Sequence, residues 1–239
     1  MATALGVRRW SLRRPSAARL GDWVLALIWV GQGAINATGA FQRWQAHDFL
    51  GAAHVSTVTA LLLLYATLVF LRSRAAKRGV GVGSKIVALI GTWSIVALSL
   101  LPLTWRPDWL LTATTVLLIA AYGWIIWTVC TLRRNLSVFP EARQLVRHGP
   151  YELVRHPLYS AHIACYVLVA LPRLSPWALL LMTAGIAAEL LRARGEERLL
   201  TSFFPDYAGY AATTPRFLPR LDVHHAKANP SSTRAAETS

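Results

Sequence analysis

Four long stretches without a charged side chain set the strongest limit on what this 239-residue chain can fold into. They cover residues 23–42, 49–71, 86–105 and 109–132. A helix needs roughly 20 apolar residues to cross the hydrocarbon core of a membrane, and each stretch reaches that length. Only 15% of the chain is charged, whereas a soluble domain usually has about a quarter. The sequence therefore predicts an all-α integral membrane protein.

Two shorter stretches without Asp, Glu, Lys or Arg follow, at residues 156–172 and 174–188. The second extends to Leu191 if Glu189 is accepted inside a membrane helix. Both are short for a complete crossing, and only the segment LPRLSP at 171–176 connects them. We therefore expect about six transmembrane helices, the last two forming a short helical hairpin.

The distribution of basic residues predicts the orientation of these helices. The chain has a net charge of +14. Arginines and lysines cluster before the first stretch, between the second and third, and between the fourth and fifth, while the other connections hold one arginine each: Arg43, Arg106 and Arg173. Basic residues favour cytoplasmic loops, so both termini are expected in the cytoplasm. Because apolar helices interrupt the basic segments, no continuous surface for nucleic acid is expected.

The balance of apolar, polar and basic residues divides the chain into four parts. Residues 1–20 are expected to form a basic cytoplasmic leader and residues 21–132 a four-helix membrane scaffold. Polar residues return at 133–220, and residues 221–239 have the composition of a disordered tail. Polar groups near a membrane are costly and usually line a cavity or a site. The region 133–220 is therefore where we expect chemistry.

One polar motif in this region is GPYELVRHPLY at 149–159. Gly149-Pro150 predicts a turn, and the next residues predict one helical turn that stops before Pro157. Tyr151, Arg155, His156 and Tyr159 would then lie together at the cytoplasmic end of the fifth helix. The composition is equally typical of an interfacial anchor in which arginine binds lipid phosphate. No cysteine or carboxylate cluster completes a metal site here.

A second motif is ELLRARGEE at 189–197. On a helix, Glu189, Arg192 and Glu196 share one face, and Glu197 points about 100° away. Arg192 and Glu196 are one turn apart and could form an ion pair. Because Glu189 would lie near the hydrocarbon boundary, it needs a partner or a wet cavity, which favours a functional role over an ordinary exposed helix end.

A third motif, FFPDYAGYAATTPRFLP at 203–219, spaces four aromatic residues as on a helix. Alone it is typical of packing or of a membrane-surface anchor. The sequence contains no GxxxxGK[ST], GxSxG or HExxH motif and no GxGxxG after a strand. These absences argue against P-loop nucleotide hydrolysis, serine hydrolysis, zincin chemistry and a soluble dinucleotide-binding fold.

Together the three motifs resemble those of the membrane methyltransferase superfamily of isoprenylcysteine carboxyl methyltransferase and phosphatidylethanolamine N-methyltransferase. The resemblance covers 133–220 and is closest to bacterial members. It implies a location in a bacterial inner membrane and a methyltransferase-like catalytic region. S-adenosylmethionine would be the methyl donor, in a pocket closed by C-terminal cytosolic helices. The implied cofactor-binding residues are Gln144, Leu145, Val146, Tyr151, His156, Pro157, Leu158, Tyr159, Glu196 and Glu197.

The resemblance also implies catalytic roles. Glu196 would bind the cationic end of the cofactor, and Arg192 would hold or orient the acceptor. Methyl transfer needs alignment and exclusion of water but no metal. If the acceptor is an amine or thiol it needs a base, for which Glu196, Glu197 and His156 are the candidates.

The expected reaction is carboxyl O-methylation of a lipidic or prenylated acceptor that enters from the membrane lipid. Methylation of a phospholipid amine or of a thiol is an alternative within the same class. Two alternatives belong to other classes: an NADPH-dependent sterol-type reductase, and a membrane scaffold without catalysis.

Overall fold

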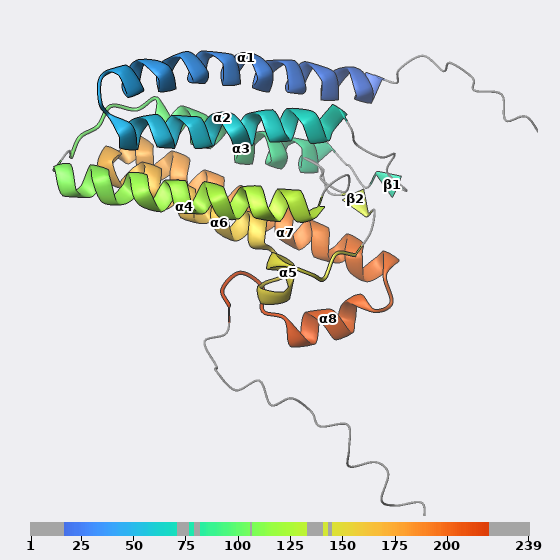
Figure 1. Ribbon diagram of the computed structural model, residues 1–239. Coiled ribbons are helices and arrows are strands. Elements are labelled where there is room, and N and C mark those ends of the chain that lie inside the picture. Colours follow the sequence, from blue (N-terminus) through green and yellow to red (C-terminus); the bar gives the residue numbers. More distant parts are fainter. Residues whose placement is uncertain are drawn as a thin grey trace, which may run out of the picture.

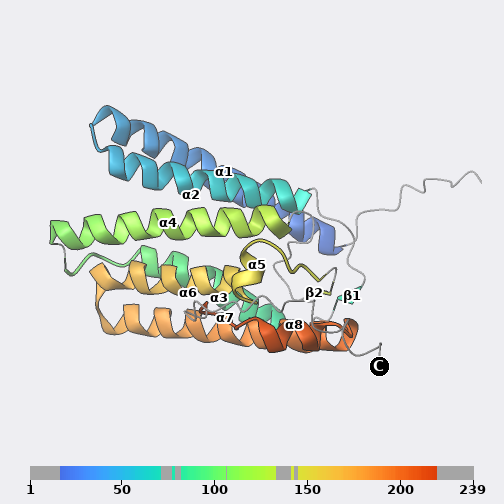
Figure 2. The same cartoon turned by 60° about the horizontal axis from the view of Figure 1, so that its bottom comes forward.

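The computed structural model describes residues 17–70, 77–78, 82–105, 107–132, 141–142 and 145–219. Most of the predicted leader, the predicted tail at 221–239 and the predicted cofactor contact Gln144 lie outside these residues. Six long helices lie roughly side by side (Figures 1 and 2). They are α1 (Ala17–Gln45), α2 (Phe49–Phe70), α3 (Val82–Ser99), α4 (Asp108–Leu132), α6 (Pro157–Ala170) and α7 (Pro176–Phe203).

The remaining elements are short. Strands β1 (Lys77–Arg78) and β2 (Glu141–Ala142) form a two-residue antiparallel pair. Helix α5 (Pro150–Leu153) precedes α6, the 3-10 helix η2 (Leu171–Arg173) joins α6 to α7, and α8 (Tyr207–Thr213) follows α7. The fold is therefore helical, as predicted.

Three of the described helices are long and apolar enough to cross a membrane: Phe49–Leu68, Asp108–Leu132 and Pro176–Phe203. The apolar stretch Ile86–Leu100, most of which belongs to α3, is shorter. With 14 residues, α6 rises only about 21 Å, less than the roughly 30 Å of a hydrocarbon core. All six predicted helices are present, and three of them meet the criteria for a full crossing.

The prediction of a short final hairpin was correct for α6 and wrong for α7. Helix α7 has 28 residues and continues through the ELLRARGEE motif to Phe203. It begins where the hydroxyl of Ser175 accepts a hydrogen bond from the backbone N–H of Ala178, with Pro176 in the first turn. No proline interrupts it before Pro205, so the charged motif extends the apolar helix instead of ending it.

The helices do not pack in their sequence order. Helix α1 packs on α2, α2 on α4, α4 on α6 and α6 on α7, while α3 packs chiefly on α7. Helices α6 and α7 approach closely at Gly185, where an added side-chain carbon would overlap the ring of Tyr166. The Tyr166 hydroxyl donates a hydrogen bond to the Gly91 carbonyl (2.6 Å) and lies 2.7 Å from Ser94 Oγ, both on α3. Tyr166 thus ties α3 to the α6–α7 pair.

Candidate active site

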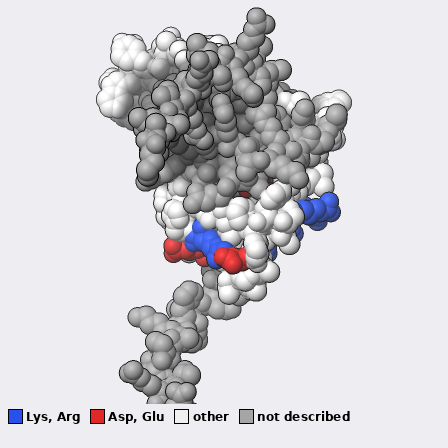
Figure 3. Space-filling model, turned by 90° about the vertical axis from the view of Figure 1, so that its right-hand side faces the viewer, with Lys and Arg blue, Asp and Glu red and all other residues white. Residues whose placement is uncertain are grey.

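The polar motifs meet at one end of the helical bundle. Helix α5, the start of α6, the last turns of α7, α8 and the segment after α8 lie together there (Figures 1 and 2). Seen from this end, acidic and basic side chains lie next to one another on the described surface (Figure 3). Residues more than 60 positions apart in the sequence, such as Arg155 and Arg216, thus share one site.

The GPYELVRHPLY motif folds as its sequence predicts. Gly149 has a φ of 65°, a left-handed conformation that favours glycine, and its N–H donates to Glu152 Oε1 (3.2 Å). Helix α5 then makes one turn and ends at Leu153. His156 occupies the position just before α6, with Pro157 in the first turn of that helix. This break between two helices is what directs His156 toward α7.

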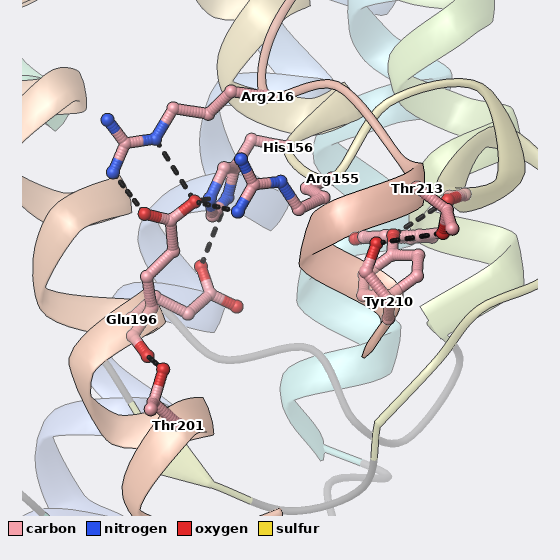
Figure 4. Close-up of polar contacts among 9 residues, drawn as sticks. Arg155, His156, Glu196, Thr201, Tyr210, Thr213 and Arg216 are labelled. Carbon is pink, nitrogen blue, oxygen red and sulfur yellow. Dashed lines mark hydrogen bonds and ion pairs between the residues drawn. The ribbon is translucent and has the colours of Figure 1, made fainter. Parts of the chain in front are cut away.

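Three cationic or basic side chains surround the carboxylate of Glu197. Arg155 Nη1 lies 3.1 Å from Oε1 and His156 Nε2 lies 3.0 Å from it. Arg216 donates from Nε to Oε1 at 3.0 Å and from Nη2 to Oε2. Figure 4 shows Arg155, His156 and Arg216 converging on the end of α7. The hydrogen bond to Glu197 raises the pKa of Arg216, so this side chain stays charged.

Backbone hydrogen bonds fasten the TPRFLP segment to the start of α6. The N–H of Arg155 donates to the Pro215 carbonyl (2.8 Å) and that of His156 to the Arg216 carbonyl (3.0 Å). The Ser160 hydroxyl donates to the Phe217 carbonyl (2.7 Å). The His156 ring packs against Phe217, with centroids 5.6 Å apart, and its side chain is only 3% exposed. His156 is therefore a buried connection between two motifs.

A second charged cluster lies about two turns earlier on α7, around Glu189 and Arg192. Arg192 Nη1 lies 3.1 and 3.2 Å from the two oxygens of Glu189, and His162 Nδ1 lies 3.4 Å from Glu189 Oε1. The Arg192 guanidinium lies over the Tyr159 ring, 5.3 Å from its centroid. The sequence predicted that Arg192 could form an ion pair with Glu196, and the structure shows Glu189 as a partner of Arg192.

Glu196 lies between these two clusters. Its Oε2 is 4.0 Å from His156 Nδ1. The side chain of Glu196 is 37% exposed, compared with 14% for Glu197 and 1% for Glu189. Among these three carboxylates of α7, Glu196 is therefore the most accessible to a ligand.

Helix α8 covers α5. The Tyr210 hydroxyl donates to the backbone carbonyl of Tyr151 (2.7 Å), and the Tyr207 and Tyr210 rings contact each other edge to face. Burial raises the pKa of Tyr151 well above its usual range and that of Tyr210 to about 12. Both phenols therefore stay protonated and neutral at physiological pH, so they add no negative charge beside the carboxylates.

The structure brings most of the predicted site residues together. Six of them lie at this end of the bundle, on or between helices α5 and α7: Tyr151, His156, Tyr159, Arg192, Glu196 and Glu197. Pro157 is buried, and its carbonyl accepts a hydrogen bond from Trp124 Nε1 (3.2 Å). Leu158 packs against the hydrophobic core. Leu145 and Val146 are partly buried in the segment before α5.

Two residues of the clusters escaped the sequence analysis. His162 is one turn beyond Tyr159 on the same helix, but a single histidine in an apolar helix carries no signal of its partner. Arg216 belongs to the TPRFLP motif, yet only the fold places it against Glu197. Within the described residues, no group of three or more His, Cys, Asp or Glu side chains is arranged to hold a metal ion.

Comparison with known families defines the class of protein to which this site belongs. Residues 109–206, which run from α4 to the end of α7, match the family model of phospholipid methyltransferases. This segment therefore belongs to the isoprenylcysteine carboxyl methyltransferase and phospholipid methyltransferase superfamily that the motifs predicted. It is a methyltransferase-family domain in a helical membrane protein.

Two curated proteins are similar to parts of the chain. The cobalt-zinc-cadmium resistance protein CzcN of Cupriavidus metallidurans is 40% identical over 85 residues, which cover 34% of this chain and 38% of that protein. The nickel-cobalt-cadmium resistance protein NccN of Alcaligenes xylosoxydans xylosoxydans is 31% identical over 142 residues, covering 56% and 66% respectively. In both cases the match spans less than two thirds of the relative.

Proposed function

We propose that this protein is an S-adenosylmethionine-dependent membrane methyltransferase. The observation that carries the proposal is the convergence of the three polar motifs at one end of an apolar helical bundle, within and beside the segment that matches the methyltransferase family. A polar cofactor can reach this end from water, and a hydrophobic acceptor can reach it between helices. Such an arrangement suits a reaction between one soluble and one lipidic substrate.

The residues present fit this cofactor. S-adenosylmethionine supplies a methyl group on a positively charged sulfur, and it also carries an ammonium group. Glu196 is a partly exposed carboxylate, and a carboxylate interacts favourably with a cation, more so where the local dielectric is low. The rings of Tyr151 and Tyr159 would supply apolar faces for the adenosine part. Glu197 is already held by Arg155, His156 and Arg216, so its role would be to shape the pocket.

We assign Arg192 to the acceptor. A guanidinium offers a planar set of donors suited to a carboxylate, so an acceptor with a carboxyl group and a lipid chain is the preferred substrate class. The protein would align the acceptor oxygen with the methyl group and exclude water, which lowers the entropic cost of transfer. Carboxyl O-methylation of a lipidic or prenylated acceptor follows as the proposed reaction.

A second acceptor class is favoured by the family match itself, because that family is named for phospholipid methylation. With a lipid amine or a thiol as acceptor, a base must take a proton before or during transfer. Glu196 would be the first candidate, since it is more exposed than Glu197 and His156.

The proposed orientation places both termini in the cytoplasm of a bacterial cell, with the protein in the inner membrane. It rests on the basic residues that precede the first apolar stretch and flank the site. The site would then face the compartment in which the cofactor is made.

The proposal is tested on the protein purified in lipid nanodiscs. S-adenosylmethionine and NADPH are titrated in parallel by calorimetry, and lipids and small acceptors are screened by mass spectrometry for methyl label from the cofactor. We expect binding of S-adenosylmethionine with a Kd in the range of about 1 μM to 1 mM and label in an acceptor. Arg192→Ala and Glu196→Ala should abolish transfer, while Arg194→Ala, an exposed neighbour on the same helix, should not.

Each other outcome points to a different conclusion. Transfer that persists in both Arg192→Ala and Glu196→Ala refutes the site assignment. Binding of NADPH without S-adenosylmethionine favours a reductase, and binding of neither favours a membrane scaffold.

A further inference from the structure

A buried ion pair lies inside α7, and one of its partners, Glu189, is not among the site residues that the sequence predicted. Glu189 is 1% exposed, and Arg192, one turn later, is 9% exposed. Removing one partner of such a pair would leave a buried uncompensated charge, which is strongly destabilising. Ionisable side chains near membrane depth are costly and rare, and they usually belong to functional sites.

The contacts hold the guanidinium of Arg192 from two sides. Both oxygens of Glu189 lie within 3.2 Å of Nη1, and the Tyr159 ring lies on another side. His162 on α6 approaches the same carboxylate at 3.4 Å. The direction in which Arg192 points is therefore set by a carboxylate that is itself fixed from a second helix.

Helix α3 packs against the Glu189 carboxylate at Gly91. A side-chain carbon at Gly91 would lie 3.1 Å from Glu189 Oε1 and 3.6 Å from Arg192 Nη1. The carbonyl of Gly91 accepts the hydrogen bond from Tyr166 of α6, so the α3 backbone is held at this position. Gly91 lies before the segment that matches the methyltransferase family, which begins at residue 109.

We infer that Glu189 is a positioning residue for Arg192, and that the bare backbone of α3 at Gly91 sets where Glu189 lies. The inference rests on the proposed function only for the consequence in methyl transfer, since the positioning itself is a property of the protein without substrate. It assigns a role in the site to α3, through a glycine at which an added side-chain carbon would lie only 3.1 Å from Glu189 Oε1.

The first test needs no activity. The protein in nanodiscs is treated with phenylglyoxal, which modifies accessible arginine guanidinium groups, and modification of Arg192 is measured by peptide mass spectrometry. In Glu189→Gln we expect Arg192 to be modified at least about fivefold faster than in the natural protein, because the contact that holds it is weakened. In Gly91→Ala the oxygen of Glu189 must move by a few tenths of an ångström, and a rise of about twofold is expected.

The matched control is Gly83→Ala on the same helix, where an added side-chain carbon meets nothing within 4 Å. It should leave the modification rate of Arg192 unchanged. Equal rates in the natural protein, Glu189→Gln, Gly91→Ala and Gly83→Ala would overturn the inference, whether or not the protein transfers methyl groups.

The second test is a double-mutant cycle on methyl transfer with Glu189→Gln and Arg192→Lys. The lysine keeps the charge but lacks the planar fork. If Glu189 acts through Arg192, Glu189→Gln lowers kcat/KM by about tenfold in the natural background and by less than about twofold when Arg192 is already lysine. Equal losses in both backgrounds would show an independent structural role. Absence of transfer in the natural protein would instead count against the proposed function, and the labelling test would still decide the inference.

Discussion

His156 and Glu197 are 41 positions apart in the sequence, and their side chains meet at 3.0 Å between Nε2 and Oε1. The contact joins the first residue before α6 to the last turns of α7. Arg155 and Arg216 bind the same carboxylate, so one oxygen pair connects three separate motifs. The arrangement makes Glu197 the residue on which the shape of the site depends.

Neutralising Glu197 should therefore destabilise the site as a whole. Glu197→Gln leaves Arg155 and Arg216 without their counter-charge, and we expect a loss of about 2 kcal/mol in the free energy of unfolding, because the cluster is only partly buried. Glu197→Gln should also weaken the binding of S-adenosylmethionine. Thermal unfolding in detergent measures the first effect, with Arg198→Gln at the neighbouring exposed position as the control. A midpoint equal to that of the control would show that the cluster contributes nothing to stability.

Glu196 should behave in the opposite way. Its side chain is 37% exposed, so Glu196→Gln should leave the unfolding midpoint close to that of the natural protein. Loss of its charge should weaken S-adenosylmethionine binding by about tenfold or more, equivalent to about 1.4 kcal/mol. Calorimetric titration measures this change. Glu152→Gln is a suitable control because glutamine keeps an oxygen that can accept the hydrogen bond from Gly149; equal affinities in the two variants would contradict the assignment of Glu196.

Tyr210 gives the protein a predictable response to alkaline pH. Burial raises the pKa of its phenol from 10.0 to about 12, so the folded state holds this proton more tightly than the unfolded chain. The resulting stability is complete below pH about 10 and is lost as pH rises toward 12. Unfolding measured in detergent on both sides of pH about 10 should show this decline, and the decline should be smaller in Tyr210→Phe.

The same variant tests the hydrogen bond that holds α8 on α5. Tyr210→Phe leaves the Tyr151 carbonyl without the bond from the phenol, at a cost of about 1 kcal/mol at neutral pH. Tyr207→Phe removes a hydroxyl from the same helix and serves as the comparison. Protease cleavage within α8 that is no faster in Tyr210→Phe than in Tyr207→Phe would show that this bond does not fix the helix.

Gly185 should tolerate no side chain. An added carbon would overlap the ring of Tyr166 at the α6–α7 crossing, and overpacking of this kind costs about 1–3 kcal/mol. Gly195→Ala lies on the same helix with nothing within 4 Å, and it should stabilise the helix by up to about 1 kcal/mol. Denaturation midpoints of the two variants should therefore move in opposite directions, and a shift of both in the same direction would disprove the close crossing.

The sequence predicted elements whose cause is local. The charge-free stretches predicted the helices because burial of the backbone in lipid requires helix formation. Gly149-Pro150 and His156-Pro157 predicted the breaks around α5 because proline and glycine limit the backbone conformation directly. The sequence placed the charged motif on a helix but gave the last hairpin a short second helix, whereas α7 continues through that motif to Phe203.

The sequence did not predict which side chains from different helices meet in the site. Helical spacing put Glu189 and Glu196 on the same face as Arg192, and the sequence analysis named only Glu196 as a possible partner. The packing of α3 and α6 against α7 places the Glu189 carboxylate beside His162 and Gly91. Arg216 likewise reaches Glu197 because the segment after α8 is bound to the start of α6.

The sequence alone predicted a helical membrane protein whose polar motifs, near the C-terminal end, resemble those of a methyltransferase superfamily. Apolar length, charge placement and proline positions act over one helix or one turn, so they are visible in the sequence. The tertiary structure decided which charges neutralise one another and which carboxylate remains accessible. Those choices depend on contacts between helices far apart in the chain, and distance in space is not encoded in local spacing.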